Sequence, residues 1–247
     1  MTDTREPFLG VGFTPLTLDD ALGRVVRRPP ELPFAYVVTP NAQHTVAAYR
    51  GEPRFLAGQA GAWMVLNDSR ILRLLARRLF GRDLPLCAGS DLVAALFDCG
   101  VTASTPIVIV GGDAEVEARL RERFGLREIR RHTPPMGFHR DETEVQRCID
   151  VVLARPARYV FLTVGAPQSE VLAARIAATG RASGVGLCVG SALNFLTGVT
   201  ARAPRAWRSA NLEWLYRLAQ NPRGHFRRVF IESFPILWIA LKTRVGA

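Results

Sequence analysis

The sequence predicts an α/β fold, built on a Rossmann-like, largely parallel sheet with helices on both faces. Short, continuously apolar runs alternate with longer segments of helical periodicity along most of the chain. Strands that are apolar at every position are typical of a parallel sheet that is buried on both faces. Most of these runs end in Gly, Asn, Asp or Pro, residues that turn a strand into the following helix. From residue 199 onward the pattern changes, and we expect a C-terminal helical appendage there.

Each expected element follows from this alternation. The expected strands span residues 34–38, 62–66, 106–110, 159–164 and 184–189, and one more short strand closes at Ile129. The expected helices span residues 16–26, 41–49, 71–80, 90–97, 114–124, 141–154 and 169–178. We therefore expect an α/β core over residues 1–198 and the appendage over residues 199–247. If the core has two lobes, the hinge between them falls near residues 99–105.

The charge of the chain is distributed unevenly. The 247 residues carry a net charge of +10, with 32 Lys and Arg against 22 Asp and Glu. Nine basic and two acidic residues follow residue 198, so the appendage holds seven of the ten net charges. A basic end on a nearly neutral body predicts an anionic partner at one place: phospholipid, nucleotide phosphate or nucleic acid.

The cysteines and the N-terminus indicate the compartment. Cys87, Cys99, Cys148 and Cys188 have no CxxC or Cys/His spacing that suggests zinc, and we expect free thiols in a reducing compartment. The start MTDTREPFLG has no secretory pattern. The longest apolar run, residues 229–241, is interrupted by polar residues and proline and is shorter than the about 20 residues that span a bilayer. We therefore expect a cytoplasmic protein, peripheral on the inner face of the cell membrane.

The membrane expectation rests on the segment from Asn211 to Lys242. It reads as two helices with a break at Asn221-Pro222, because proline fixes φ and removes a hydrogen-bond donor. The second helix has an apolar surface formed by Phe226, Val229, Phe230, Phe234, Leu237, Trp238 and Leu241. Arginines border this surface, which suits a membrane with aromatic rings among the lipid headgroups. The alternative is an amphipathic helix pair that docks on its own domain.

Polar residues and turns follow five of the expected strands, and in an open parallel sheet ligands bind beyond the carboxyl ends of the strands. These residues are Thr39, Asn41, Asn67, Asp68, Gly111, Gly112, Asp113, Gly165, Pro167, Gln168, Glu170, Gly190, Ser191 and Asn194. Each alone has a simpler structural interpretation, since Gly-Gly after a strand is typical of a tight turn and Asp of a helix cap. Their convergence at one edge predicts a pocket.

Asp68 is the favoured general base, because it is the carboxylate directly after the apolar strand 62–66. Its alternative role is to cap the helix that starts near Ile71. His44 and His139 have no recognisable partner and are expected to be structural or surface residues. The sequence contains no GxSxG elbow, Walker A loop, full GxGxxG or Asp-x-Asp pair, which disfavours hydrolases, P-loop enzymes, dehydrogenases and a metal-bound sugar nucleotide.

A series of motifs in a fixed order resembles one family. The series is TPN at 39–41, Asp68, GSDL at 89–92, GG at 111–112, PPMGF at 134–138, GAP with Glu at 165–170, NFLTG at 194–198, RAP at 202–204 and LEWLYRL at 212–218. It resembles the WecG/TagA/CpsF glycosyltransferases over roughly residues 10 to 240. The long C-terminal motif is the most specific part of the resemblance.

The resemblance implies inverting, metal-independent transfer of a sugar from a UDP-sugar to a polyprenyl-diphosphate-linked sugar acceptor, in cell-surface or exopolysaccharide assembly and with no cofactor. It implies that Asp68 is the catalytic base, that Thr39 and Asn41 line the pocket, and that the appendage meets the membrane. The implied donor-binding residues are Gly111, Gly112, Gly165, Pro167, Gln168, Glu170, Gly190 and Ser191. The implied phosphate- or membrane-binding residues are Arg205, Arg217, Arg223, Arg227 and Arg228.

Four residues depart from the family pattern at the expected pocket. Ser69, Ser169, Leu86 and Asn194 stand where the family usually has Gly, Gln, Arg and Asp. They motivate the alternative of a catalytically weak, nucleotide-sugar-binding pseudoenzyme. The basic charge raises a second alternative, an RNA-binding protein, but the chain has no RNP-like aromatic motif and we expect no nucleic acid partner. Self-association into a homo-oligomer is a further way to cover the apolar appendage.

Overall fold

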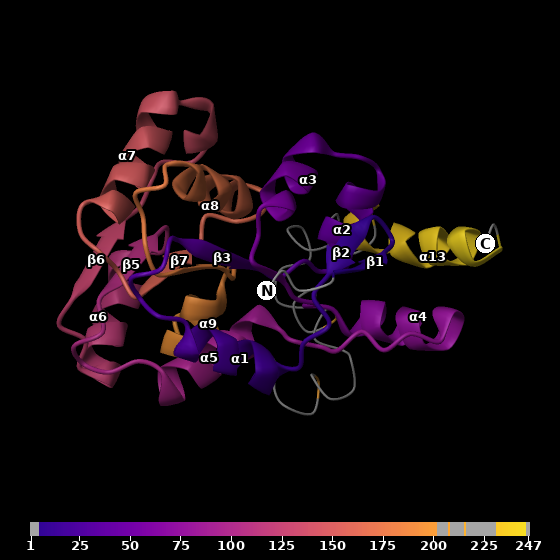
Figure 1. Ribbon diagram of the computed structural model, residues 1–247, viewed down its shortest axis with the longest axis horizontal. Helices are drawn as coiled ribbons and strands as arrows, with labels where there is room; N and C mark the ends of the chain where they lie inside the picture. The colour runs from indigo at the N-terminus through magenta and orange to yellow at the C-terminus, as the bar shows by residue number, and fades with distance from the viewer. Residues whose placement is uncertain (1–4, 202–206, 208–214, 216–230, 246–247) are drawn as a thin grey trace.

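The computed structural model describes residues 5–201, Trp207, Leu215 and residues 231–245. Its centre is a six-stranded parallel sheet in the order β4-β3-β8-β7-β5-β6 (Figure 1). The strands are β3 Ala35–Val38, β4 Met64–Val65, β5 Ile107–Val110, β6 Ile129–His132, β7 Tyr159–Leu162 and β8 Val185–Cys188. Val38 pairs with Cys188 and Val110 with Leu162, so the carboxyl ends of the strands align at one edge. The predicted α/β class with a parallel sheet is confirmed.

Helices cover both faces of the sheet (Figure 1). One side holds α2 Ala42–Tyr49, α3 Pro53–Ala60, α4 Arg70–Phe80, α7 Glu142–Leu153 and α8 Gln168–Ala178. The other side holds α1 Leu18–Arg27, α5 Gly89–Cys99, α6 Ala114–Phe124 and α9 Ala192–Thr197. Successive residues of one strand point to opposite faces, so Tyr36 and Val38 belong to the first core and Val37 to the second. This is why the strands are apolar at every position.

The helix boundaries follow from local capping. The side chains of Asn41, Ser69 and Asp113 each accept a hydrogen bond from the backbone N–H three residues later, at the start of α2, α4 and α6. At the other ends of α4 and α6, Gly81 and Gly125 adopt left-handed conformations that favour glycine. Each capping residue follows shortly after the end of a strand, so α2, α4 and α6 begin at the carboxyl edge of the sheet.

Several elements differ from the expectations. The hairpin of β1 Glu6–Phe8 and β2 Val11–Phe13, and the helices α3 and α9, were not predicted. β6 begins at Ile129, where the sequence predicted its end, so that prediction was wrong. β6 is the edge strand, and its residues after Ile129 are only half-buried, so it lacks the continuous apolar run by which the other strands are recognised.

The described C-terminal part packs on the core. Helix α13, Pro235–Val245, contacts α2 and α4, and it buries Ile236, Ile239 and Ala240 in the same core cluster as those helices. It begins at Pro235, a residue favoured in the first helical turn. A π-helical turn at residues 231–233 precedes α13, and the earlier part of the predicted second helix lies outside the described residues. The expected break at Asn221-Pro222 lies outside the described residues.

Two further observations concern the domain and membrane expectations. Residues before and after 99–105 contribute strands to the same sheet, and the two-lobe hinge stays a prediction. Among the described helices, none has the length and apolar character needed to cross a bilayer.

Candidate functional site

Thr39 connects the ends of two central strands. It directly follows β3, is buried, and its hydroxyl donates a hydrogen bond to the Cys188 carbonyl of β8 at 3.2 Å. The start of α5 approaches the same hydroxyl, because a Cβ built at Gly89 would lie 2.9 Å from Thr39 Oγ1. Glycine is therefore required at position 89 for the GSDL segment to pack against the end of β3.

Asn41 has a structural role at this edge. Its side-chain oxygen accepts a hydrogen bond from the His44 N–H at 3.2 Å, and its backbone carbonyl accepts one from the Thr45 hydroxyl at 3.0 Å. Asn41 is thus the N-cap of α2, and this bond uses Oδ1 but not the Nδ2 amide group. The side chain is half-buried at the carboxyl end of β3. The predicted Thr39-Pro40-Asn41 turn therefore lies at the edge that was expected to bind ligand.

Asp68 is held against that turn. Its backbone N–H donates to the Pro40 carbonyl at 3.1 Å, which places the residue beside the end of β3. The alternative role predicted for it, capping the next helix, is wrong. The cap of α4 is Ser69, whose hydroxyl accepts from the Leu72 N–H at 3.4 Å. Asp68 is half-buried, and its carboxylate is not the cap of α4.

Asp91 is a second carboxylate, in addition to Asp68, in the surroundings of Cys87. Both influence Cys87, whose N–H donates to the Asn67 carbonyl at 2.9 Å. Burial first, and then the charges of Asp68 and Asp91, raise the pKa of the Cys87 thiol to about 12. Asp91 stands in the first turn of α5 and was not singled out from the sequence. It could have been found there, because it is the acidic residue of the GSDL motif that carries part of the family resemblance.

The Gly111-Gly112 turn has a clear backbone requirement. Both glycines have positive φ angles, 103° and 65°, and a Cβ at Gly111 would lie 2.6 Å from Thr163 Oγ1. The Gly111 N–H donates to the His132 carbonyl at 2.8 Å, and the Gly112 carbonyl accepts from the Thr133 hydroxyl at 2.8 Å. A tight turn therefore explains both glycines. It lies at the carboxyl edge, directly before α6.

The segment from Gly165 to Glu170 turns β7 into α8. Gly165 has a φ of 84°, the Ala166-Pro167 peptide bond is cis, and α8 begins at half-buried Gln168. Ser169, which stands in place of a common glutamine, is buried, and its hydroxyl donates to the Leu162 carbonyl at 3.1 Å. The short side chain at position 169 is therefore held against the carboxyl end of β7.

Glu170 is buried and not exposed at the edge of the sheet. It is 7% exposed and packs against Gly58 of α3. Burial raises the pKa of its carboxyl to about 7, and its Oε2 has no hydrogen-bond partner within residues 5–201 and 231–245. The structure thus places Glu170 beneath the Gly165-Pro167 turn, between α8 and α3, while the turn itself is half-buried at the edge.

The remaining predicted residues divide into two groups. Gly190 and Ser191 follow β8, are exposed, and precede α9, so they lie at the same edge as Thr39. Arg205, Arg217, Arg223, Arg227 and Arg228 lie outside the described residues. A separate hollow of about 390 Å³, lined in part by Gly100, Thr105 and Arg158, contains none of the predicted residues. It lies beside the amino ends of β5 and β7, at the opposite edge of the sheet.

The edge therefore combines the Asp68 carboxylate near the end of β3, a buried hydrogen bond between Thr39 and β8, and glycine turns before α6 and α8. A family model described as "Glycosyl transferase WecG/TagA/CpsF family" matches residues 6–247, nearly the whole chain. A family of glycosyl transferases implies a nucleotide-sugar donor and an acceptor as substrates. The match covers every element described above and agrees with the motif resemblance in the sequence. The chain belongs to the WecG/TagA/CpsF family of glycosyl transferases.

Proposed function

We propose that this protein transfers a sugar from a UDP-sugar to a polyprenyl-diphosphate-linked sugar acceptor at the inner face of the cell membrane, in exopolysaccharide or cell-surface polysaccharide assembly. The observation that carries the proposal is the position of Asp68, tied by its backbone to the Thr39-Pro40-Asn41 turn at the carboxyl edge of a parallel sheet. Sheets of this kind bind ligands at that edge. Family membership supports transfer from a nucleotide sugar.

In the proposed mechanism, the Asp68 carboxylate accepts the proton of the acceptor hydroxyl. The hydroxyl oxygen forms a bond to the anomeric carbon from the face opposite UDP. The bond from that carbon to the diphosphate oxygen breaks, and its electron pair leaves with UDP, so the anomeric configuration inverts. Proton transfer to a positioned side chain typically contributes roughly 10²–10⁴-fold to the rate.

The leaving diphosphate gains negative charge, which backbone N–H groups and arginines can stabilise. The Gly111-Gly112 and Gly165-Pro167 turns directly precede α6 and α8, and helix N-termini favour phosphate groups. We assign Gly190, Ser191 and Gln168 to donor binding on the same edge, and Glu170, whose carboxyl is buried against α3, to the first turn of α8 beside the donor. We also assign the five appendage arginines to phosphate or membrane binding. The proposed transfer needs no metal and no cofactor.

The membrane part of the proposal rests on the outer face of α13. Ile236, Ile239 and Ala240 pack inward, but a second apolar stripe faces outward along the same helix and the turn before it. This stripe consists of Ile231, Phe234, Trp238, Leu241 and Val245. Its spacing of three and four residues is that of one helix face. Lys242 and Arg244 are exposed in the last turn of the same helix, and Trp238 is 72% exposed.

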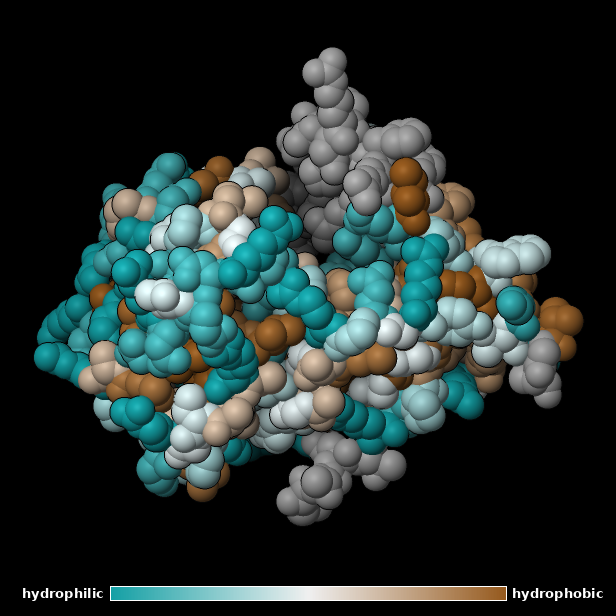
Figure 2. All heavy atoms as spheres, turned by 90° about the horizontal axis from the view of Figure 1, so that it is seen from above, coloured by the Kyte–Doolittle hydropathy of each residue, from teal (hydrophilic) through white to brown (hydrophobic). Residues whose placement is uncertain are grey.

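Helix α4, which contacts α13, also carries exposed apolar and basic side chains. Leu74 is exposed on α4, and so are Arg73, Arg77 and Arg78. Figure 2 shows hydrophobic surface among hydrophilic residues at the right-hand end of the molecule, where Figure 1 places α4 and α13. Apolar and aromatic side chains with basic neighbours suit the interface of an anionic membrane. The two interpretations of the appendage are therefore compatible, since α13 docks on its own domain and still presents an apolar face.

The proposal is tested by measuring transfer from a panel of UDP-sugars to a polyprenyl-diphosphate-sugar in detergent, with wild type, Asp68→Asn and Asp98→Asn. Asp98 is a matched control, an exposed aspartate at the far end of α5. We expect turnover with one donor, which Asp68→Asn loses while still binding UDP and which Asp98→Asn retains. UDP binding without turnover would favour the pseudoenzyme alternative. Absence of UDP binding would contradict the proposal, and salt-dependent RNA binding without vesicle binding would favour the RNA alternative.

A further inference from the structure

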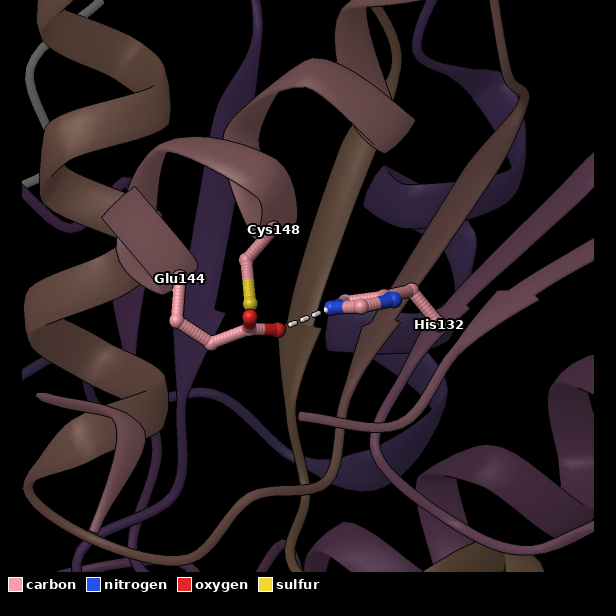
Figure 3. A group of neighbouring side chains, drawn as sticks. All are labelled: His132, Glu144 and Cys148. Atoms are coloured by element: carbon pink, nitrogen blue, oxygen red, sulfur yellow. Dashed lines mark hydrogen bonds and ion pairs between the residues drawn. The ribbon is translucent and has the colours of Figure 1, made fainter. Parts of the chain in front are cut away.

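We infer that His132, Glu144 and Cys148 form a binding site for a zinc-class divalent cation between β6 and α7. Their ligand atoms, an imidazole nitrogen, a carboxylate oxygen and a thiol sulfur, all lie within 4.8 Å of one another. Figure 3 shows Glu144 and Cys148 extending from the same helix, with the carboxylate beneath the sulfur and directed at the His132 ring. The inference goes beyond the proposed transfer and does not depend on it.

The fold explains why these three residues meet. Glu144 and Cys148 are four residues apart on α7, one helical turn, so both side chains lie on the face that packs against the sheet. His132 is the last residue of the edge strand β6, which α7 contacts. Cys148 and Glu144 are buried and His132 is half-buried, so the cluster has two ligands in the interior and one near the surface.

Neighbouring residues hold the side chains of the cluster in place through hydrogen bonds. Nε2 of His132 lies 2.6 Å from Oε1 of Glu144, and the other carboxylate oxygen, Oε2, lies 2.9 Å from the Arg147 guanidinium. Arg147 therefore holds the carboxylate by one oxygen and leaves the other to face the histidine. Ligating carboxylates commonly have such an outer hydrogen-bond partner. The backbone of His132 is fixed as well, because its carbonyl accepts the Gly111 N–H at 2.8 Å.

The chemical types of the three ligand atoms indicate which class of cation the cluster binds. Thiolate, imidazole and carboxylate together suit Zn²⁺ and chemically similar ions, whereas Mg²⁺ and Ca²⁺ are bound through oxygen. Zinc bonds of about 2.0 Å to nitrogen or oxygen and about 2.3 Å to sulfur fit a cluster of this size after small side-chain movements. Three protein ligands leave one position for water, on the side where His132 reaches the surface.

Binding of the cation replaces two interactions of the empty cluster. The hydrogen bond between Nε2 of His132 and Oε1 of Glu144 opens, the Nε2 proton passes through solvent to Nδ1, and the freed Nε2 and the carboxylate oxygen turn to the metal. The Cys148 thiol loses its proton to solvent and binds as a thiolate. A bound divalent cation stabilises the thiolate form of the sulfur.

Cobalt absorption of the full-length protein tests the site, since Co²⁺ is a coloured probe for zinc-class positions. Apo-protein is titrated with CoCl₂ and then with ZnCl₂, as wild type, Cys148→Ser, His132→Gln and the control Cys99→Ser. Cys99 is an exposed free thiol at the end of α5. We expect a thiolate-to-cobalt absorption band at one equivalent in wild type and Cys99→Ser, displaced by Zn²⁺ and lost in the other two. Outer-shell partners alone are worth about 10–100-fold in metal affinity, so the loss of a ligand should cost at least as much.

Thermal melting provides a second readout. Zn²⁺ should raise Tm for wild type and Cys99→Ser and leave it unchanged for Cys148→Ser and His132→Gln. His132→Gln is expected to fold, because His132 is half-buried and the glutamine amide can still donate a hydrogen bond to Glu144. Loss of the cobalt band in this variant therefore reports loss of the ligand and not misfolding. A cobalt spectrum without a thiolate band, a band that persists in Cys148→Ser, or a Tm shift shared by all four proteins would overturn the inference. The cluster would then be only an ion pair beside a buried thiol.

Discussion

Gly58 of α3 lies directly against Glu170 of α8, so that a Cβ built at Gly58 would stand 2.6 Å from the Cβ of Glu170. The same glycine carbonyl accepts a hydrogen bond from the buried Tyr36 hydroxyl at 3.0 Å. Because position 58 has no side chain, α3 can pack closely over the start of α8. The hydrogen bond from Tyr36 links α3 to strand β3 of the sheet. It also explains why the Glu170 carboxyl is buried and has a raised pKa.

Gly58→Ala should destabilise the protein, because the added methyl group overlaps Glu170 and part of its backbone. Overpacking of a tight contact typically costs about 1–3 kcal/mol. Denaturant unfolding of the variant measures this loss. Gly12→Ala is the control, since its Cβ would have its nearest neighbours at 3.4 Å, an ordinary contact. Equal stability of the two variants would contradict the close approach of α3 and α8.

The pH dependence of stability should carry a contribution from Glu170. Its pKa is raised from 4.5 to about 7 in the folded state, so the folded state binds the proton more tightly than the unfolded state does. The stabilisation is fully present below about pH 4.5 and is lost as the pH rises through about 7. The shift corresponds to roughly 3 kcal/mol, as an order of magnitude.

Glu170→Gln tests that contribution by removing the ionisation. We expect the free energy of unfolding of wild type to fall relative to that of Glu170→Gln between pH 4.5 and 7.5. The matched control is Glu142→Gln on α7, an exposed glutamate whose pKa is lowered by its hydrogen bond to Arg175. A wild-type stability curve parallel to that of Glu170→Gln across this range would contradict the assigned burial.

Gly111→Ala and Gly165→Ala should separate backbone strain from steric overlap. Both positions have positive φ, which costs an alanine about 1–2 kcal/mol. A Cβ at Gly165 meets no atom within 4 Å, whereas one at Gly111 lies 2.6 Å from Thr163 Oγ1. Unfolding measurements should therefore show the larger loss for Gly111→Ala. If the turns also bind the donor, both variants weaken UDP binding, as calorimetry would measure. Identical stability losses would contradict the close contact at Thr163.

The double variant Trp238→Ser/Leu241→Ser should keep the fold and lose membrane affinity. Both side chains are exposed on α13, and burying one large apolar side chain is worth roughly 1.5–3 kcal/mol. Co-sedimentation with anionic vesicles should fall by about tenfold or more, since each factor of ten corresponds to about 1.4 kcal/mol. Ile239→Ser is the comparison, because Ile239 is buried and its loss should lower Tm. Unchanged vesicle binding of the double variant would argue against α13 as the membrane contact.

The alternation of apolar runs and helical periodicity predicted most of the fold because it follows directly from burial. Val108 and Ile109 face opposite cores, so both must be apolar, and the strand is visible in the sequence. The edge strand β6 carries Arg130, Arg131 and His132 and was misplaced for the same reason, since it is not buried on both sides. The hairpin of β1 and β2 is too short for its periodicity to be recognised.

The candidate site was predictable where a residue follows a recognisable strand. Thr39 and Asp68 were found in this way, and the structure brings their backbones together through the Pro40 carbonyl. Asp91 was missed because it follows a loop, and its effect on Cys87 depends on how α5 packs against the sheet. Glu170 was expected at the donor side, but the close approach of α3 to α8 at Gly58 buries its carboxyl.

The sequence by itself determined the α/β class, the order of most elements and the family, because apolar periodicity and contiguous motifs are local properties of the chain. Only the tertiary structure decided which distant residues become neighbours. His132 and Cys148 have no zinc-like spacing, yet they meet because α7 packs across β6. α13 is apolar on more than one side, and only its docking against α2 and α4 selects Ile236 and Ile239 for the core and leaves Trp238 outside. The physical reason is that packing joins surfaces whose complementarity the linear order of residues does not contain.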